Sequence, residues 1–283
     1  MTSTAPGAQP GGLIHCDQEL GRRLEGAEGQ SNADFVDARA IAFPEVGAEW
    51  TRIAGTYAMF DGVGSPTTQT FGLGVFEEVE TAQLQELEDF FTDRRSDVFH
   101  EVSPVADLLT LSLLGGRGYR AIEWSNVLFR TIDNQVRVGS RANKGIRVRE
   151  IAPGDEDLWA ETAARGWSDV APDLGDYFTD LGKVTAHRKN THSFLAETAA
   201  GPIASGALCL SQGVAVLAGA STEPASRKQG AQLALLESRL RFAVERGCDL
   251  AMITTLPGSA SQRNAERWGF RVAYTRVKWR LSR

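Results

Sequence analysis

The sequence has few cysteines, no long apolar run and no excess of positive charge. Its 283 residues include three cysteines, Cys16, Cys209 and Cys248. This odd and widely spaced set excludes a disulfide framework and suits a reducing compartment, so we expect a cytoplasmic protein. No stretch of about 18 apolar residues occurs, so we expect no transmembrane helix and no membrane partner. The formal net charge of −6 argues against nucleic acid as a partner.

The amino-terminal segment also lacks the features of a targeting sequence. A secretory signal needs a basic leader and then an apolar run, and MTSTAPGAQPGG contains neither. Residues 1–30 are rich in Gly, Ala, Ser and Gln, a composition that favours disorder. We therefore expect a flexible tail over residues 1–30, with order beginning near Ser31.

Residues 146–283 read as strand, helix, three strands, helix, strand, helix, strand. Gly201 and Gly213 mark tight turns between the three consecutive strands, and apolar residues at helical spacing follow Gly230. The predicted strands are 146–151, 193–197, 202–210, 214–222, 249–254 and 270–281, and the predicted helices are 158–167, 230–246 and 257–267. Residues 178–189 are either a further, polar helix or a loop. This order indicates an α/β (α+β) fold with a mixed sheet.

The amino-terminal half repeats that order in a weaker form. Its predicted strands are 50–60, 68–76, 97–102 and 118–132, and its predicted helices are 80–95 and 103–116. The segment DVFHEV, a helix and GYRAIEW match DLAMIT, a helix and GFRVAY near the carboxyl terminus. We infer a duplication, with one module over residues 31–135, a second over residues 146–283 and a linker near residues 133–145.

The main chemical signal lies between a strand and a helix, at residues 224–232 (PASRKQGAQ). The first turn of a helix offers free backbone N–H groups and the positive end of the helix dipole, which together bind anions. Gly230 allows the backbone to approach a pyrophosphate closely. Arg227 and Lys228 add positive charge just before the helix.

This segment resembles the signature of the GNAT acetyltransferase family, which is Arg or Gln, two residues, Gly, one residue, then Gly or Ala. Arg227 and Gly230 fit it, whereas Gln232 stands where the family has a small residue. Pro224 and the Gly269-Phe270 turn after the last helix are also similar to the family. The resemblance covers residues 146–283 well and the first half only as a degenerate copy, so it implies two GNAT-like modules.

The resemblance implies acetyl-CoA, or another short acyl-CoA, as co-substrate, with no metal. The strand over residues 214–222 would diverge from the strand over residues 249–254, and the pantetheine arm would lie between them. Backbone groups near Ala220 would pair with that arm and polarise the thioester, and amides at the start of the next helix would hold the pyrophosphate. The cofactor-binding candidates are Ala220, Ser221, Thr222, Arg227, Lys228, Gln229, Gly230, Ala231, Gln232, Ser261 and Asn264.

The corresponding position in the first half has the opposite charge. Glu77, Glu78 and Glu80 precede its helix, and these carboxylates would repel a pyrophosphate. We therefore expect no cofactor in that half. It would shape the acceptor pocket, or complete the fold or a homodimer.

The acid and base of the reaction are open. The resemblance implies a tyrosine four residues before Gly269, and this sequence has Ala265 there. Tyr274 and Tyr177 are alternative acids, and Glu197 and Glu223 are candidate bases. Each also has an ordinary structural explanation, as a packed ring or a solvated carboxylate.

The sequence thus predicts an N-acyltransferase that moves an acetyl or short acyl group from coenzyme A to an amine, with a small molecule as acceptor. A protein amine stays open as acceptor, and the acidic chain would attract a cationic one. The alternative is a non-catalytic acyl-CoA-binding or sensing module, and a further one is a scaffold dimer in which Gln232 blocks the pyrophosphate. His187 and His192 lack partners for a metal site.

Overall fold

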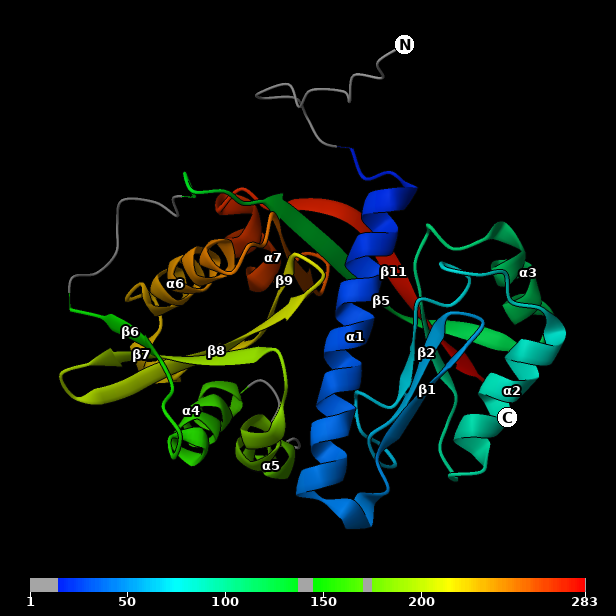
Figure 1. Ribbon diagram of the computed structural model, residues 1–283, viewed down its shortest axis with the longest axis horizontal. Coiled ribbons are helices and arrows are strands. Elements are labelled where there is room, and N and C mark those ends of the chain that lie inside the picture. Colours follow the sequence, from blue (N-terminus) through cyan, green and yellow to red (C-terminus); the bar gives the residue numbers. More distant parts are fainter. Residues whose placement is uncertain (1–14, 137–144, 170–174, 283) are drawn as a thin grey trace.

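The computed structural model describes residues 15–136, 145–169 and 175–282. One mixed sheet of eleven strands runs through the described chain, in the order β1-β2-β3-β4-β11-β5-β10-β9-β8-β7-β6 (Figure 1). The strands are β1 Glu49–Ile53, β2 Thr56–Phe60, β3 Gln69–Phe71, β4 Phe99–Val102, β5 Tyr119–Thr131, β6 Arg147–Glu150, β7 Thr191–Thr198, β8 Gly201–Ser211, β9 Val214–Thr222, β10 Leu250–Thr255 and β11 Arg271–Leu281. The helices are α1 Gln18–Ala42, α2 Thr81–Thr92, α3 Leu108–Gly116, α4 Glu156–Trp167, α5 Gly175–His187, α6 Ala231–Glu245 and α7 Ala260–Arg267.

The two halves share the sheet by exchanging their last strands. β5, from the first half, pairs with β10 of the second half, and β11, from the second half, pairs with β4 of the first. β5 and β11 also pair with each other along most of their length in the middle of the sheet. The segments matched by sequence therefore occupy equivalent places, and the halves cannot separate without breaking the centre of the sheet.

The second half follows its predicted order throughout. β7, β8 and β9 form an antiparallel set, and β9 pairs in parallel with β10, which confirms the mixed sheet. Residues 137–144 of the predicted linker lie outside the described residues. Within the described residues, no helix combines the length and apolar character needed to cross a bilayer.

The strand prediction for residues 50–60 was wrong, because this segment is a hairpin. Ala54 and Gly55 both have positive φ, 44° and 69°, and reverse the chain between β1 and β2. Two positive φ values are typical of a tight hairpin turn, which Gly favours and Ala does not. The strand predicted over residues 68–76 is also shorter than expected, since β3 contains only Gln69–Phe71.

The prediction of a flexible tail was wrong for residues 18–30, which begin α1. Asp17 caps this helix through a 2.9 Å hydrogen bond from the Leu20 amide to its carboxylate. Leu24 and Ala27 are fully buried against the sheet, and α1 crosses in front of it between the two halves (Figure 1). The glycines that imitate a disordered composition allow close packing, since a Cβ on Gly29 would lie 2.7 Å from the Tyr57 ring. The expectation for residues 1–14 lies outside the described residues.

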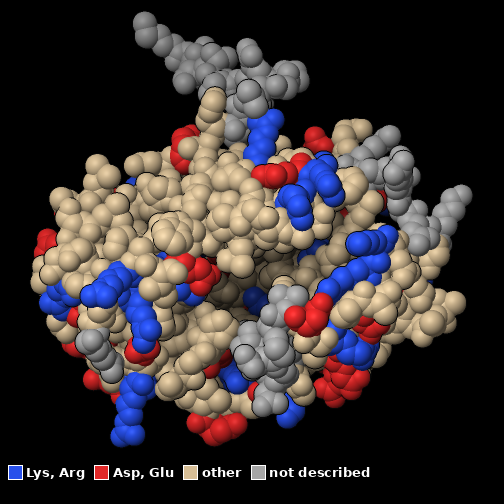
Figure 2. All heavy atoms as spheres, turned by 180° about the vertical axis from the view of Figure 1, so that it is seen from behind, with Lys and Arg blue, Asp and Glu red and all other residues tan. Residues whose placement is uncertain are grey.

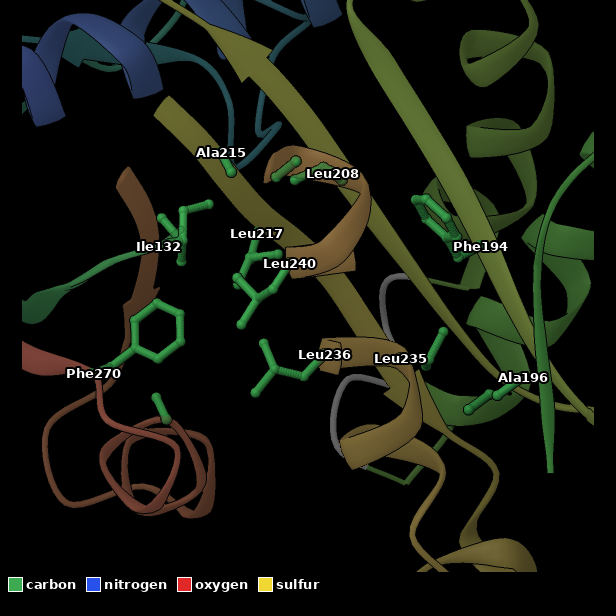
Figure 3. Packing of buried hydrophobic residues seen from close by; sticks show 14 of the residues in the cluster. Ile132, Phe194, Ala196, Leu208, Ala215, Leu217, Leu235, Leu236, Leu240 and Phe270 are labelled. Carbon is green, nitrogen blue, oxygen red and sulfur yellow. The ribbon is translucent and has the colours of Figure 1, made fainter. Parts of the chain in front are cut away.

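Alternation along β9 separates two cores on opposite faces of the sheet. Ala215 and Leu217 pack with α6 and α7, whereas Val214 and Val216 pack with the side of α1 that holds Leu24. Figure 3 shows the first of these cores, in which apolar side chains from α6 meet those of the strands. Each fully buried Leu contributes about 1.5–3 kcal/mol through the hydrophobic effect, so these layers hold β9 and α6 firmly on either side of the loop that joins them.

Candidate active site between strands β9 and β10

The candidate site begins where two parallel strands separate. β9 and β10 pair through three residue pairs, the last of them Val216 with Met252. β9 continues to Thr222 and β10 to Thr255, so both strands extend beyond their paired segment. Their facing backbone groups can accept an extended ligand in place of the missing strand partner. The predicted divergence of these strands is therefore present.

A β-bulge turns the backbone of β9 outward at the same level. The register with β8 shifts between the pairs Ser205–Ser221 and Ala207–Ala218, so that Gly219 and Ala220 lie opposite one residue. Such a bulge leaves backbone groups outside the ladder and redirects them. Ala220, the predicted oxyanion-hole residue, is therefore the partly exposed point of β9 next to the opening.

A buried arginine in α6 supports this bulge. Arg239 is 3% exposed, and its Nη1 donates to the carbonyls of Ala207, at 2.9 Å, and Ala218, at 3.4 Å. Burial lowers the pKa of Arg239 to about 10. Gly206 leaves room for the guanidinium, since a Cβ there would lie 3.1 Å from Arg239 Cζ. The sequence did not reveal this role, because Arg239 reads as one more polar residue of an amphipathic helix.

The loop after β9 leads into a helix whose amino terminus no side chain caps. The short helix Pro224–Ser226 is followed by Lys228 with φ 64° and by Gly230, the N-cap of α6, with φ 96°. Lys228 and Gln229 are exposed, and Ala231, the first residue of α6, is buried. The uncapped first turn of a 15-residue helix provides N–H groups and a positive dipole end for an anion.

Arg227 holds this loop against α4 rather than extending from it. Its guanidinium donates to both carboxylate oxygens of Asp169, at 2.6 and 2.7 Å, and to the carbonyls of Gly166 and Thr222. The positive guanidinium would not repel an anion, but its N–H donors are already engaged. Arg227, one of the predicted cofactor-binding residues, therefore joins the loop to the end of α4.

Three other predicted residues have partners within the fold. The Ser221 hydroxyl lies 3.1 Å from that of Ser205 and donates to the carbonyl of Ala163, so it joins β9 to α4. Gln232 Nε2 donates to Thr222 Oγ1 at 2.8 Å, which turns the side chain back toward β9. The residue that departs from the GNAT signature thus makes a contact that a small residue could not make.

α7 presents the remaining cofactor candidates. Ser261 and Asn264 are exposed on this helix, whereas Ala265 is buried in the core beside Phe270. The position at which the family resemblance implied a tyrosine is therefore occupied by a methyl group facing the core. No hydroxyl is available there for protonating a leaving thiolate.

The structure does not bring the predicted acid and base to the opening. The Tyr274 hydroxyl donates to Glu25 at 2.7 Å beneath α1, and burial raises the pKa of Tyr274. Glu197 lies on β7, which β8 and β9 separate from β10, and it pairs with Arg147 at 3.0 Å and Arg149 at 2.8 Å. Although burial raises the pKa of Glu197, these two arginines outweigh it and lower the value.

Of the two other candidates, only Glu223 can be placed by its side chain. Glu223 forms an ion pair with Arg165 of α4. The side chain of Tyr177 lies outside the described residues. Of the described residues, none form a group of three His, Cys, Asp or Glu side chains placed to hold a metal ion.

A cavity of about 380 Å³ adjoins the free end of β10 on the face that α1 covers. Its lining combines α1, the segment before β3, three strands of the first half, the end of β10 and β11: Glu28, Asn32, Pro66, Thr67, Gln69, Phe71, Glu101, Glu123, Ser125, Thr254, Thr255, Leu256 and Arg276. Figure 2, seen from behind the view of Figure 1, shows the opposite face, which has a hollow at its centre with acidic and basic residues around it.

An ionic cluster occupies the floor of the cavity. Arg276 is 1% exposed, and its Nη2 donates to Glu28 at 2.7 Å, with Glu25 3.6 Å and Glu101 3.9 Å from other guanidinium nitrogens. Burial alone would lower the pKa of Arg276, but the surrounding carboxylates raise it. Burial raises the pKa of Glu25 and Glu101, and Arg276 opposes that rise. Glu28 also accepts a hydrogen bond from Thr254 at 3.1 Å.

The sequence could not have identified this cluster. Its residues come from α1, β4, β10 and β11, and Glu28 lies within the segment that was read as a tail. Arg276 and Glu28 are separated by 248 residues. No local spacing connects them, and only the position of α1 across the sheet brings them together.

No protein-family model matches the sequence, and no curated protein sequence is similar to it. Solved structures are similar in fold. A GCN5-related N-acetyltransferase from Kribbella flavida has a TM-score of 0.64 at 17% identity, covering 92% of this chain and 95% of that one. A tandem GNAT protein from the clavulanic acid biosynthesis pathway has a TM-score of 0.58 at 10% identity, covering 95% and 98%. A GCN5-related N-acetyltransferase from Sphaerobacter thermophilus has a TM-score of 0.53 at 18% identity, covering 75% and 71%.

The protein therefore has the fold of the GNAT acetyltransferases. The tandem GNAT structure matches both halves of the chain, which confirms the predicted fold class. At these identities the likeness concerns the fold, and activity has to be argued from the residues of this chain.

Proposed function

We propose that the protein is an N-acyltransferase that transfers an acetyl or other short acyl group from coenzyme A to an amine of a small molecule. The second half would bind the acyl-CoA, and both halves with α1 would form the acceptor pocket. We retain the division into modules over residues 31–135 and 146–283 as part of this proposal, with α1 as an element shared between them. A cytoplasmic location and a homodimer stay predictions.

The residues present fit an acyl-CoA. The unpaired continuation of β9 and the bulge at Gly219 and Ala220 suit an extended amide-containing arm, which can form hydrogen bonds as a neighbouring strand would. The uncapped start of α6 suits a pyrophosphate. When bound, acetyl-CoA supplies a thioester whose acetyl group passes to an amine nitrogen as the carbon–sulfur bond breaks and the thiol leaves.

Glu28 is the carboxylate best placed to remove a proton from the incoming amine. It lines the cavity beside Thr254, at the end of β10 that borders the opening. Its hydrogen bonds from Thr254 and Arg276 hold the carboxylate in one orientation, which a general base requires. With Ala265 in place of a hydroxyl, the proton for the leaving thiolate comes from solvent.

The observation that carries this proposal is the opening between β9 and β10, from which β9 leads directly into the uncapped α6. The test is acetyl-CoA binding by the full chain, measured as a thermal shift and by titration calorimetry. Gly230→Glu places a carboxylate at the start of α6 and should abolish the shift. A ligand at 100 times its Kd stabilises a protein by about 2.7 kcal/mol, so its loss is readily measured.

Gly247→Glu is the matched control. Gly247 follows the other end of α6 and also has a positive φ, 83°, so the substitution introduces the same charge and a similar backbone strain. The Gly247→Glu protein should keep the acetyl-CoA shift. If Gly230→Glu keeps it too, the pyrophosphate does not bind at α6 and the proposal fails.

The buried Ala265 favours a second candidate, a module that binds or senses acyl-CoA without catalysis. Such a module would show the same acetyl-CoA shift and the same response to Gly230→Glu. It would not release free thiol when acetyl-CoA is incubated with a panel of amines. Thiol release that depends on the amine would exclude it.

A further inference from the structure

The cavity under α1 contains buried polar atoms that have no partner within the described chain. Gln69 is 6% exposed and its Oε1 accepts no hydrogen bond, and Thr255, also 6% exposed, has an unpaired Oγ1. Buried polar atoms are normally paired, since an unpaired one costs about 1–3 kcal/mol. Both side chains line the cavity, so a ligand there would satisfy them. A carbonyl oxygen such as Gln69 Oε1 accepts only from a donor, which an amine provides.

Glu101 adds a buried carboxylate with weak partners. It is 6% exposed, and its nearest donor is the Ser125 hydroxyl at 3.5 Å. Its two ion pairs are long, 3.9 Å to Arg276 and 3.8 Å to Lys278. A charged hydrogen bond normally measures about 2.7–2.9 Å, so Glu101 has capacity for a stronger cationic partner.

The charges around the cavity are unbalanced. Three carboxylates line it, those of Glu28, Glu101 and Glu123, and Arg276 is the one lining residue that carries a positive charge. Arg276 is already held by Glu28 and lies near Glu25 below. The negative charge that Arg276 does not balance is therefore on the side of the first half, at Glu123 and at Glu101, whose other cation, Lys278, lies 3.8 Å away.

Two carboxylates of the cavity, Glu28 on α1 and Glu101 on β4, suit two separate amines. Glu28 and Thr254 lie beside the cofactor opening, whereas Glu101 and Gln69 belong to β4 and β3 of the first half. Glu28 and Glu101 both approach one guanidinium, so these carboxylates lie no more than about 9 Å apart. An extended chain spans about 1.2 Å per single bond, so a diamine with roughly four to six carbons between its nitrogens reaches both.

We propose that the acceptor is an aliphatic diamine or polyamine, whose reacting amine lies at Glu28 and whose second, charged nitrogen binds Glu101 and Gln69 of the first half. This inference rests on the proposed function, and it assigns to the first half the role of selecting the acceptor. The cavity volume of about 380 Å³ suits such a molecule, since small-ligand sites span about 300–1,000 Å³.

The test compares 1,5-diaminopentane with 5-aminopentan-1-ol, which has the same length but one charge. Both are titrated into the full chain without acetyl-CoA, in a calorimeter. We expect the diamine to bind at least about tenfold more tightly, because one charge-assisted hydrogen bond is lost in the alcohol. Glu101→Gln should remove that difference. Gln69→Met should weaken diamine binding as a second, independent variant.

Glu86→Gln is the matched control, since Glu86 is an exposed carboxylate on α2 outside the cavity. It should keep the preference for the diamine. Equal binding of the two amines, or a preference that survives Glu101→Gln, would overturn the inference. Because these titrations contain no acetyl-CoA, their failure is distinct from that of the proposed function, which the acetyl-CoA shift tests by itself.

Discussion

Acid should destabilise this protein through one buried histidine of the first half. His100 on β4 is fully buried, with Nδ1 2.7 Å from Thr70 Oγ1 and Nε2 2.9 Å from the Tyr119 hydroxyl. Burial lowers the pKa of His100 from 6.5 to about 3. Below pH 6.5, His100 binds a proton in the unfolded chain but stays neutral in the folded protein. The free energy of unfolding therefore falls as the pH drops from 6.5 toward 3.

The magnitude follows from the same pKa difference. One pKa unit corresponds to about 1.4 kcal/mol, so His100 alone should remove about 2.7 kcal/mol of stability at pH 4.5 relative to pH 7.5. The assay is urea denaturation of the full chain at pH 7.5, 6.0 and 4.5. Carboxylates titrate in the same range, so the informative quantity is the difference in slope between the wild type and His100→Gln.

Below pH 6, the free energy of unfolding of His100→Gln should fall less steeply than that of the wild type, and the two slopes should differ by about 1.4 kcal/mol per pH unit. This difference does not depend on the stability of the variant at pH 7.5. His187→Gln is the control, because His187 is exposed on α5 and its removal should leave the wild-type slope. If His100→Gln keeps that slope, His100 is not buried in neutral form between Thr70 of β3 and Tyr119 of β5.

Two further predictions test α1 and the phosphate loop. Gly26→Ala should raise the free energy of unfolding by up to about 1 kcal/mol, because its Cβ would meet only ordinary contacts at 3.7 Å. Gly29→Ala should lower it by about 1–2 kcal/mol, because its Cβ would overlap with Tyr57. Urea denaturation measures both changes, and a disordered segment would show neither. Arg227→Ala and Asp169→Ala should weaken acetyl-CoA binding equally, and the double variant should be no weaker, because the two act as one pair. A loss confined to Arg227→Ala, measured by calorimetry, would instead mean that Arg227 contacts the phosphate directly.

The exchanged strands bring both halves of the chain to the cavity under α1. β5 and β11 are long strands of 13 and 11 residues, and each pairs with strands of the other half. The cavity lies on the face of these strands that α1 covers, so its walls come from both halves. In the proposed function, the first half contributes acceptor contacts through this arrangement.

Local patterns were sufficient wherever burial follows one element's own periodicity. Leu84, Leu87 and Phe91 recur on one face of a helix, and all three are fully buried. The hairpin from β7 to β8 was predictable because the turn before Gly201 lies between two apolar runs. The divergence of β9 from β10 followed from the order of elements and the family resemblance.

Local patterns failed where the conformation depends on a partner far along the chain. Gly21, Gly26 and Gly29 lower helix propensity, and α1 is stabilised instead by burying Leu24 and Ala27 against strands of both halves. The turn at Ala54 was missed because Ala rarely adopts a positive φ.

The sequence alone determined the α/β order, the glycine at the start of the helix after β9 and the absence of a hydroxyl at Ala265, because each of these is set by neighbouring residues. Tertiary structure alone decided that Arg227 pairs with Asp169, that β5 and β11 change places, and that Glu28, Glu101 and Arg276 meet under α1. Buried ion pairs such as these form only when distant segments of the chain fold together, because no short-range spacing in the sequence specifies which carboxylates will lie next to a buried guanidinium.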